Sequence, residues 1–130
     1  MNEVFEFLRN SGAFYLATLD KDQPRVRPFG VVEIYEDKLY FLTGKKKNVS
    51  KQIHENPKVE MCALQGEKWL RLSGKLFADD RVEAKKYFLD KNPHLRSMYN
   101  EDDDNTEVLY IEDATAVFSS FVEEDRIVKF

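Results

Sequence analysis

The stretch KLYFLTGKKKNVSKQIHENPKVEMCALQGEKWLRLSGKLF, residues 38–77, contains the pattern that decides the fold. It predicts three strands and one helix: a strand over 38–43, a helix over 48–56 that Pro57 cannot continue, and strands over 58–64 and 67–77 joined at Gln65-Gly66. Strands joined by tight turns are antiparallel, because a parallel pair needs a long crossover between its strands.

The rest of the chain extends this pattern in both directions. Further strands are predicted over 13–19, 25–34, 106–113 and 114–122, with a last edge at 127–130, and further helices over 2–11 and 79–91. The helix over 79–91 is expected to be capped by Asp79 or Asp80, with Glu83 closing a capping box. Six or seven strands against three short helices predict an α+β protein, mainly antiparallel, built as a β-barrel with peripheral helices.

Composition narrows the function classes before any motif is considered. A length of 130 residues suits one domain over 1–130, and a net charge of −4 argues against a nucleic-acid partner. A single cysteine excludes an internal disulfide and fits a reducing compartment. No apolar run approaches the ~20 residues of a membrane span, and the N-terminus is acidic where a signal peptide would be basic. We therefore expect a cytoplasmic protein without a membrane partner.

The first candidate site is the basic turn of the opening stretch. Thr43, Gly44 and three consecutive lysines, Lys45–Lys47, lie between a predicted strand and the start of a predicted helix. Free backbone N–H groups at a helix start and lysine ammonium groups both favour a bound phosphate. The alternative is a solvated basic turn, and the spacing of a Walker loop is absent.

The second candidate is QPRVRPFG, residues 23–30. Arg25 and Arg27 point to the same side of a strand, where guanidinium groups can hold phosphate oxygens bidentately. Pro28 within the strand indicates an edge or a bulge, where backbone groups are free. The alternative is a pair of surface arginines on a barrel edge.

The third candidate is EKWLRLSG, residues 67–74, where Trp69, Arg71 and Ser73 share one face. An aromatic ring beside an arginine suits either a planar ligand or a subunit contact. His54 and His94 lack metal-ligand spacing, so no metal site is predicted. Cys62 alternates within an apolar strand and is expected to be a small buried side chain.

Taken in order, three segments carry a family resemblance: FYLATLDKDQPRVRPFG (14–30), LYFLTGKKKNVSKQIHENPKVEMCAL (39–64) and KWLRLSGKLF (68–77). They resemble the pyridoxamine 5′-phosphate oxidase-like family of FMN-binding split barrels, in particular its small members related to nitroimidazole reductases. The resemblance implies a six-stranded Greek-key split β-barrel with short peripheral helices. It also implies a homodimer with FMN in grooves between the subunits.

The resemblance also implies a set of cofactor-binding residues. Arg27 matches the family's phosphate-binding arginine, and Lys47 matches the lysine that closes the phosphate site. The further residues implied as FMN contacts are the backbone of Pro28, Phe29 and Gly30, the pair Leu42 and Thr43, Lys45 or Lys46 as a second cation, Gln52, and Trp69 from the neighbouring subunit. From their own positions on the strands, we add Arg25 beside the phosphate and Arg71 beside the ring.

Departures from the family pattern limit what the resemblance implies about the reaction. The full oxidases have a longer loop before the lysine and a C-terminal substrate motif of Arg-x-His type, and this chain has GKKK and ends in VKF. We expect an FMN-dependent oxidoreductase acting on an unidentified small molecule, with no catalytic residue assigned. The alternatives are a flavin-binding sensor or carrier without turnover, and a split barrel that uses deazaflavin or haem.

Overall fold

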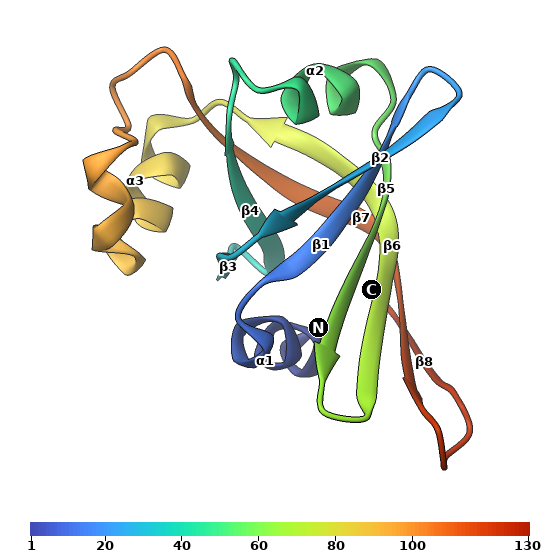
Figure 1. The fold of residues 1–130 in the computed structure, drawn as a ribbon. Coiled ribbons are helices and arrows are strands. Elements are labelled where there is room, and N and C mark those ends of the chain that lie inside the picture. The colour runs from blue at the N-terminus through green and yellow to red at the C-terminus, as the bar shows by residue number, and fades with distance from the viewer.

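The computed structural model describes residues 1–130, which form a curled sheet with helices around it (Figure 1). The helices are α1 (Asn2–Ser11), α2 (Asn48–Glu55), α3 (Val82–Lys91) and the 3-10 helix η1 (Pro93–Ser97). The strands are β1 (Phe14–Asp20), β2 (Gln23–Phe29), β3 (Val32–Tyr35), β4 (Lys38–Gly44), β5 (Lys58–Gln65), β6 (Lys68–Asp79), β7 (Thr106–Ser120) and β8 (Arg126–Lys129). None of the helices is long and apolar enough to cross a bilayer.

The sheet runs in the order β2-β1-β5-β6-β7-β4-β3, with β8 added to β7, and its neighbours pair antiparallel. Its two ends, β2 and β3, are consecutive in the chain and yet do not pair with each other. Figure 1 shows α2 over one end of the curled sheet, α1 at the other end, and α3 to the side of β4. The mainly antiparallel α+β prediction is therefore confirmed.

The predicted number of six strands is wrong, because the sheet has eight. The strand expected over 25–34 is interrupted at Gly30 and Val31, so that β2 pairs with β1 while β3 pairs with β4. The two strands expected over 106–122 are one strand, β7, long enough to pair with β4, β6 and β8. The last edge near the C-terminus is present as β8.

The main core lies inside the curl of the sheet and is formed by side chains from one face of the strands. It includes Phe14, Leu16, Met61 and Leu72, which are all 0% exposed. A second core forms where α3 and η1 cover the outside of β4, packing Phe88 and Leu95 around Tyr40. Burial on both faces explains why β4 is an almost continuous apolar run in the sequence.

The start of α3 differs from its prediction. Arg81 is the N-cap residue, and no side chain caps the helix. Asp79 is instead the last residue of β6 and a buried one, and its carboxylate accepts hydrogen bonds from Tyr40 Oη (2.7 Å) and Arg81 Nη2 (2.8 Å). A carboxylate bound by two donors from outside the helix is not free to cap it.

An outer face of the sheet is left uncovered by helices. The register aligns one row of side chains across six strands: Pro28, Tyr15, Cys62, Arg71, Val117 and Ile127. We call this set the outer-face row. Cys62 belongs to it and is exposed, so the expectation of a buried cysteine is wrong, since the alternation of β5 turns Met61 inward instead.

Candidate functional site

A cavity of about 620 Å³ lies between the β1–β2 hairpin and helix α2. Four basic side chains line it: Arg25, Arg27, Lys47 and Lys51. Its other lining residues are Asp20, Val26, Asn48, Val49, Gln52 and Glu55. We call it the cationic cavity, because it gathers bases from two predicted clusters that are about 20 positions apart in the chain.

Arg27 is held at the base of this cavity by neutral acceptors. Its Nη1 donates to the hydroxyl of Thr18 (2.7 Å) and to the carbonyl of Leu16 (3.2 Å), while Nη2 donates to Oε1 of Gln52 (2.7 Å). Burial, together with the positive charge of Arg25, lowers the pKa of Arg27. An arginine has five N–H donors, so this arrangement leaves donors of Arg27 for another acceptor.

Gln52 connects the helix to the strands through one atom. Its Oε1 accepts from both Arg27 and the Thr18 hydroxyl, the latter at 2.6 Å. The side chain is buried and lines the cationic cavity, and its Nε2 group makes no hydrogen bond to the protein. Since no buried side-chain donor in the molecule lacks a partner, this amide donor is accessible to a ligand.

The basic turn before α2 is shaped by Asn105, which precedes β7. The backbone amide of Lys45 donates to the carbonyl of Asn105 (2.7 Å), and the amide of Lys46 donates to its side-chain oxygen (3.0 Å). Gly44 lies so close that an added Cβ would be 2.9 Å from Nδ2 of Asn105. The turn therefore ends with Lys47 as the N-cap residue of α2, a helix without a side-chain cap.

The opposite face of α2 is fixed to β7. The Glu107 carboxylate is almost fully buried and accepts from the Ser50 hydroxyl at 2.7 Å. Its second oxygen lies 2.7 Å from Nε2 of His54. With Gln52 bound on one side and Glu107 on the other, the start of α2 is held in place over the cationic cavity.

A second cavity of about 200 Å³ adjoins the first, and both are lined by Arg27, Lys47 and Val49. We call it the apolar cavity, because most of its walls are hydrophobic. Its further lining residues are Pro28, Phe29, Gly30, Val31, Leu42, Thr43, Leu95, Met98 and Tyr99. An elongated ligand with an anionic end and an apolar end would fit this pair of cavities.

The structure brings together most of the residues singled out in the sequence. Arg25, Arg27, Lys47 and Gln52 line the cationic cavity, and the segment 28–30 lines the apolar cavity with Leu42 and Thr43. Lys45 and Lys46 line neither cavity. Lys45 lies 4.0 Å from Asp80 instead, so that the cluster of three lysines contributes one residue to the site.

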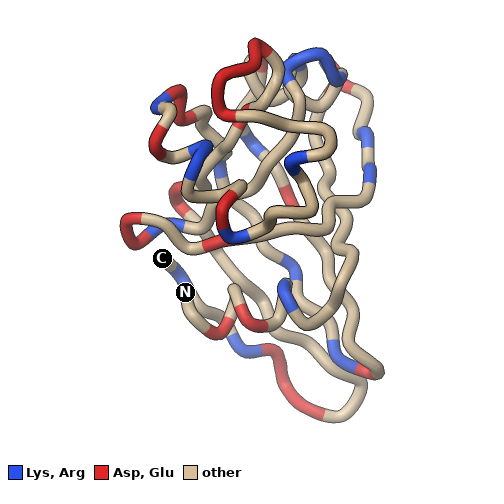
Figure 2. The backbone as a smooth tube through the Cα atoms, turned by 90° about the vertical axis from the view of Figure 1, so that its left-hand side faces the viewer, with Lys and Arg blue, Asp and Glu red and all other residues tan.

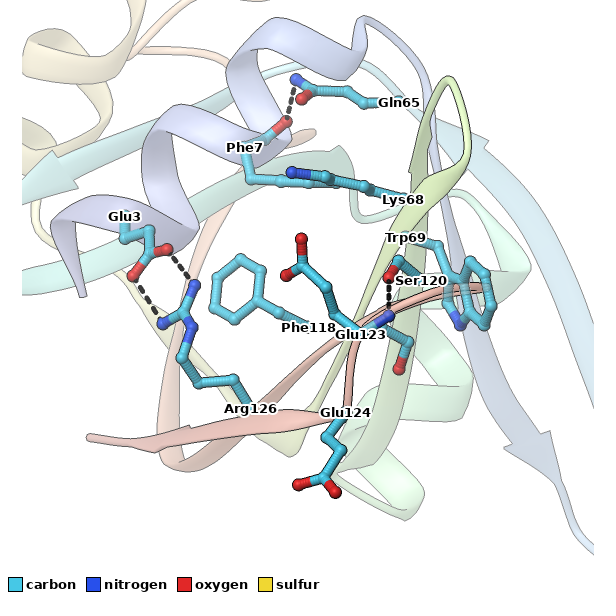
Figure 3. Close-up of a pocket in the computed structure, with 11 residues that line it drawn as sticks. Glu3, Phe7, Gln65, Lys68, Trp69, Phe118, Ser120, Glu123, Glu124 and Arg126 are labelled. Carbon is cyan, nitrogen blue, oxygen red and sulfur yellow. Dashed lines mark hydrogen bonds and ion pairs between the residues drawn. The ribbon is translucent and has the colours of Figure 1, made fainter.

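Trp69 and Arg71 lie away from both cavities of the same chain. Arg71 is exposed in the middle of the outer-face row. Trp69 borders a third cavity of about 250 Å³, between α1 and the β7–β8 hairpin (Figure 3). Its ring packs on that of Phe121, with the ring centroids 5.1 Å apart. The Glu3 carboxylate pairs with Arg126 in that third cavity, whose lining also includes Lys68, Glu123 and Glu124.

Basic and acidic segments lie beside each other at one end of the molecule, and a further acidic turn lies at the other end (Figure 2). In Figure 2 the basic turn before α2 lies at the top, and the acidic turn between β7 and β8 lies at the bottom. The acidic loop over 101–104 lies near the basic turn, since Asn105 binds both Lys45 and Lys46. Asp103 folds this loop by accepting the backbone amides of Asn105 (2.9 Å) and Thr106 (2.6 Å).

Sequence reasoning missed two groups of lining residues. Lys51 lies one turn after Lys47 on α2, a helical spacing that could have revealed it. Leu95, Met98 and Tyr99 reach the apolar cavity from η1 and the residues after it, and their sequence carries no recognisable motif. They arrive there because α3 packs on the outside of β4.

Fold and cavities together define a small α+β protein with a curled antiparallel sheet and a cationic cavity, and comparisons with known proteins give its family. The sequence model described as pyridoxamine 5′-phosphate oxidase matches residues 1–112. The chain belongs to this family, as the resemblance predicted. It is also similar to the crystal structure of a NimC/NimA family protein from Clostridium acetobutylicum. The identity is 42%, the TM-score is 0.97, and the match covers 100% of this chain and 92% of that one.

Two more distant structures share the fold. General Stress Protein 26 from Bacillus anthracis is 16% identical with a TM-score of 0.79, over 99% of this chain and 97% of that one. A pyridoxamine 5′-phosphate oxidase-related, FMN binding protein from Nostoc punctiforme is 15% identical with a TM-score of 0.67, over 99% and 93%. Comparison with curated proteins found no match.

Proposed function

We propose that this chain binds FMN, with the phosphate in the cationic cavity and the isoalloxazine ring in the apolar cavity, and that it is an FMN-dependent oxidoreductase acting on a small molecule. The observation that carries the proposal is Arg27. It lies where the two cavities meet, and only neutral acceptors bind its guanidinium. A phosphate dianion is recognised by positive charge that no protein carboxylate has neutralised.

Several donors from this chain would hold the phosphate. They are the remaining N–H groups of Arg27, the ammonium groups of Lys47 and Lys51, and the free amide of Gln52. The N-terminus of α2 adds its unpaired backbone N–H groups and its dipole. Of the three consecutive lysines, we assign Lys47 to the phosphate, since Lys45 faces Asp80. Arg25 contributes charge from the cavity wall, reduced by its ion pair with Asp20 at 3.3 Å.

The apolar cavity would orient the ring and keep water from one of its faces. Gly30 and Val31 lie outside any strand, so the backbone after β2 is available along the ring edge. Leu42 and Thr43 lie on β4 across from this segment. Bound FMN would supply the redox chemistry, and the chain would supply binding and orientation. The FMN-binding relative from Nostoc punctiforme supports this choice of cofactor.

We further propose a homodimer that places the cofactor between subunits. The outer-face row ends at Pro28, which also lines the apolar cavity. The surface around this row exposes Tyr15 (52%), Leu64 (64%) and Val26 (68%), an apolar area that a second copy would cover. Trp69 and Arg71 belong to the same face, so that each subunit would bring them toward the ring of its partner.

Cofactor binding is tested on the purified protein by its visible spectrum and by titration with FMN. We expect flavin absorbance as isolated, or stoichiometric uptake of FMN on reconstitution. A protein without flavin absorbance that takes up no FMN contradicts the proposal. Turnover is tested by stopped-flow oxidation of the reduced flavin with nitroaromatics, quinones and oxygen. Only slow, unselective reoxidation would indicate a flavin carrier or sensor instead.

The dimer is tested by light scattering on wild type and on Leu64→Glu. The wild type should have the mass of two chains, and a charge on the outer face should shift the mass toward one chain and weaken FMN binding. Val82→Glu is the matched control, since Val82 is 49% exposed on α3, away from the outer face. A monomeric wild type that binds FMN would overturn the interfacial site alone.

A further inference from the structure

The wall of the apolar cavity that comes from η1 and the residues after it has a fixed part and an exposed part. Leu95 and Tyr99 are both 8% exposed and pack in the second core with Tyr40. Met98 lies between them in sequence and is 68% exposed at the cavity. The position of Tyr99 is therefore set by core packing, independently of any ligand.

Buried hydroxyl groups in this molecule fall into two sets. Those of Thr18, Tyr40, Ser50 and Thr106 all form hydrogen bonds within the protein. The remaining buried hydroxyl residues are Thr43, Tyr99 and Ser119, whose hydroxyls have no protein partner, and each of them lines a cavity. No hydroxyl is both inaccessible and unpaired. Among the buried residues, every hydroxyl without a protein partner therefore belongs to a residue that lines a cavity.

Thr43 and Tyr99 line the same cavity from different elements. Thr43 is 2% exposed on β4, and Tyr99 follows η1. Both residues are buried and line this cavity, and neither hydroxyl has a partner in the protein, so each is free to bond to a ligand bound there. A ligand that contacted this wall through carbon alone would leave a phenol hydroxyl desolvated and unpaired, which is unfavourable.

We infer that Tyr99 is a ring-binding residue, whose hydroxyl donates a hydrogen bond to a planar conjugated ligand that carries a carbonyl oxygen or ring nitrogen at its edge. The inference rests on the proposed function, in which that ligand is the isoalloxazine ring. Leu95 and Met98 supply apolar contact beside this donor. A hydrogen bond donated to a ring heteroatom stabilises the electron-rich reduced ring, so Tyr99 raises the reduction potential of the bound flavin.

The test compares Tyr99→Phe with wild type for FMN affinity, riboflavin affinity and flavin reduction potential. Loss of one hydrogen bond to the ring should weaken both ligands by a similar factor, about 3- to 10-fold. The reduction potential should become more negative. Tyr87→Phe is the matched control, because Tyr87 packs on Tyr35 with ring centroids 4.6 Å apart and does not line the cavity. It should change none of the three values.

The outcomes separate this inference from the proposed function. Unchanged affinities and an unchanged potential in Tyr99→Phe overturn the role of Tyr99, while flavin binding by the wild type would still stand. A wild type that binds neither flavin overturns both proposals. A loss confined to FMN would place the hydroxyl at the phosphate and contradict ring binding. The melting temperature of Tyr99→Phe should stay close to that of wild type, which excludes a general loss of folding.

Discussion

Arg27 and Arg81 each donate several hydrogen bonds, but the acceptors of Arg81 are carboxylates and those of Arg27 are neutral oxygens. Arg81 donates to the carboxylates of Asp79 (2.8 Å) and Glu36 (2.8 Å), and these bonds raise the pKa of Arg81. Arg27 donates only to neutral oxygens, and burial lowers its pKa. The positive charge of Arg81 is neutralised by carboxylates of the protein, whereas that of Arg27 is available to a ligand. The charge of the partners, more than their number, distinguishes a structural arginine from a binding one.

The largest expected effect tests the structural side of this comparison. Asp79→Ala removes the acceptor of the Tyr40 hydroxyl, which is buried, and should lower the free energy of unfolding by about 3 kcal/mol. Burial and the bond to Asp79 raise the pKa of Tyr40, so this hydroxyl stays a donor. Chemical denaturation measures this loss of stability. The FMN affinity of the variant should stay within about 2-fold of wild type, since substitutions away from a site usually have small effects. If Asp79→Ala kept its stability but bound FMN more weakly, Arg81 and its partners would be part of the binding site and not of the structural core.

The binding side is tested by Arg27→Ala. FMN affinity should fall about 30-fold, while riboflavin affinity changes by less than about 3-fold, because a lost phosphate contact matters only to the phosphorylated ligand. Thr18 still donates to Gln52 in the variant, so the free energy of unfolding should fall by less than about 1 kcal/mol. Fluorescence titration with both ligands measures the difference. Equal losses for FMN and riboflavin would contradict the assignment.

Acid pH tests the hydrogen bonds that Asp79 accepts from Tyr40 and Arg81 without removing any side chain. The hydrogen bonds from Arg81, with those from Tyr40, hold the pKa of Asp79 at about 2, although burial opposes them. A depressed carboxyl pKa stabilises the folded state above the pKa of the unfolded chain, near 4, and this stabilisation is lost as pH falls toward 2. As the pH falls from about 4 to about 2, the free energy of unfolding of wild type should decrease by about 2 kcal/mol more than that of Asp79→Asn. Parallel pH profiles of the two proteins would refute the contribution.

The smallest effect separates the consecutive lysines. Lys47→Ala should weaken FMN about 5-fold and riboflavin hardly at all, as expected for one exposed ammonium group near the phosphate. Lys45→Ala is the matched control, with a change below about 2-fold, because Lys45 faces Asp80. Added salt should reduce the difference between the two variants. Identical losses would mean that the lysines act through their summed field instead.

Sequence alone predicted most of the strands and the two basic segments that meet in the cationic cavity. The alternation of Arg25 and Arg27, and the strand–turn–helix order around Lys47, were sufficient because both are local patterns. Among the three adjacent lysines, the family resemblance singled out Lys47, while the conformation of the turn that separates it from Lys45 and Lys46 is not a local feature. It depends on Asn105, which fixes the turn from nearly 60 positions away.

Contacts between distant elements explain the remaining misses. Asp79 has the sequence context of a helix cap, but Tyr40 and Arg81 bind its carboxylate first. Gln52 was recognised through the family pattern, while its bond to Thr18 depends on how α2 lies over β1. Tyr99 had no signal at all, since its place at the apolar cavity follows from packing in the second core.

The close approach of Gly44 and Asn105 has an evolutionary consequence. A Cβ at position 44 would lie 2.9 Å from Nδ2 of Asn105, so the Asn105 side chain would have to shift, and a smaller residue at 105 would release the backbone amide of Lys46. A change at either position disturbs the bond between Asn105 and Lys46, so we expect the two residues to occur together among relatives that keep this short turn. Relatives with a longer turn should have lost both residues together.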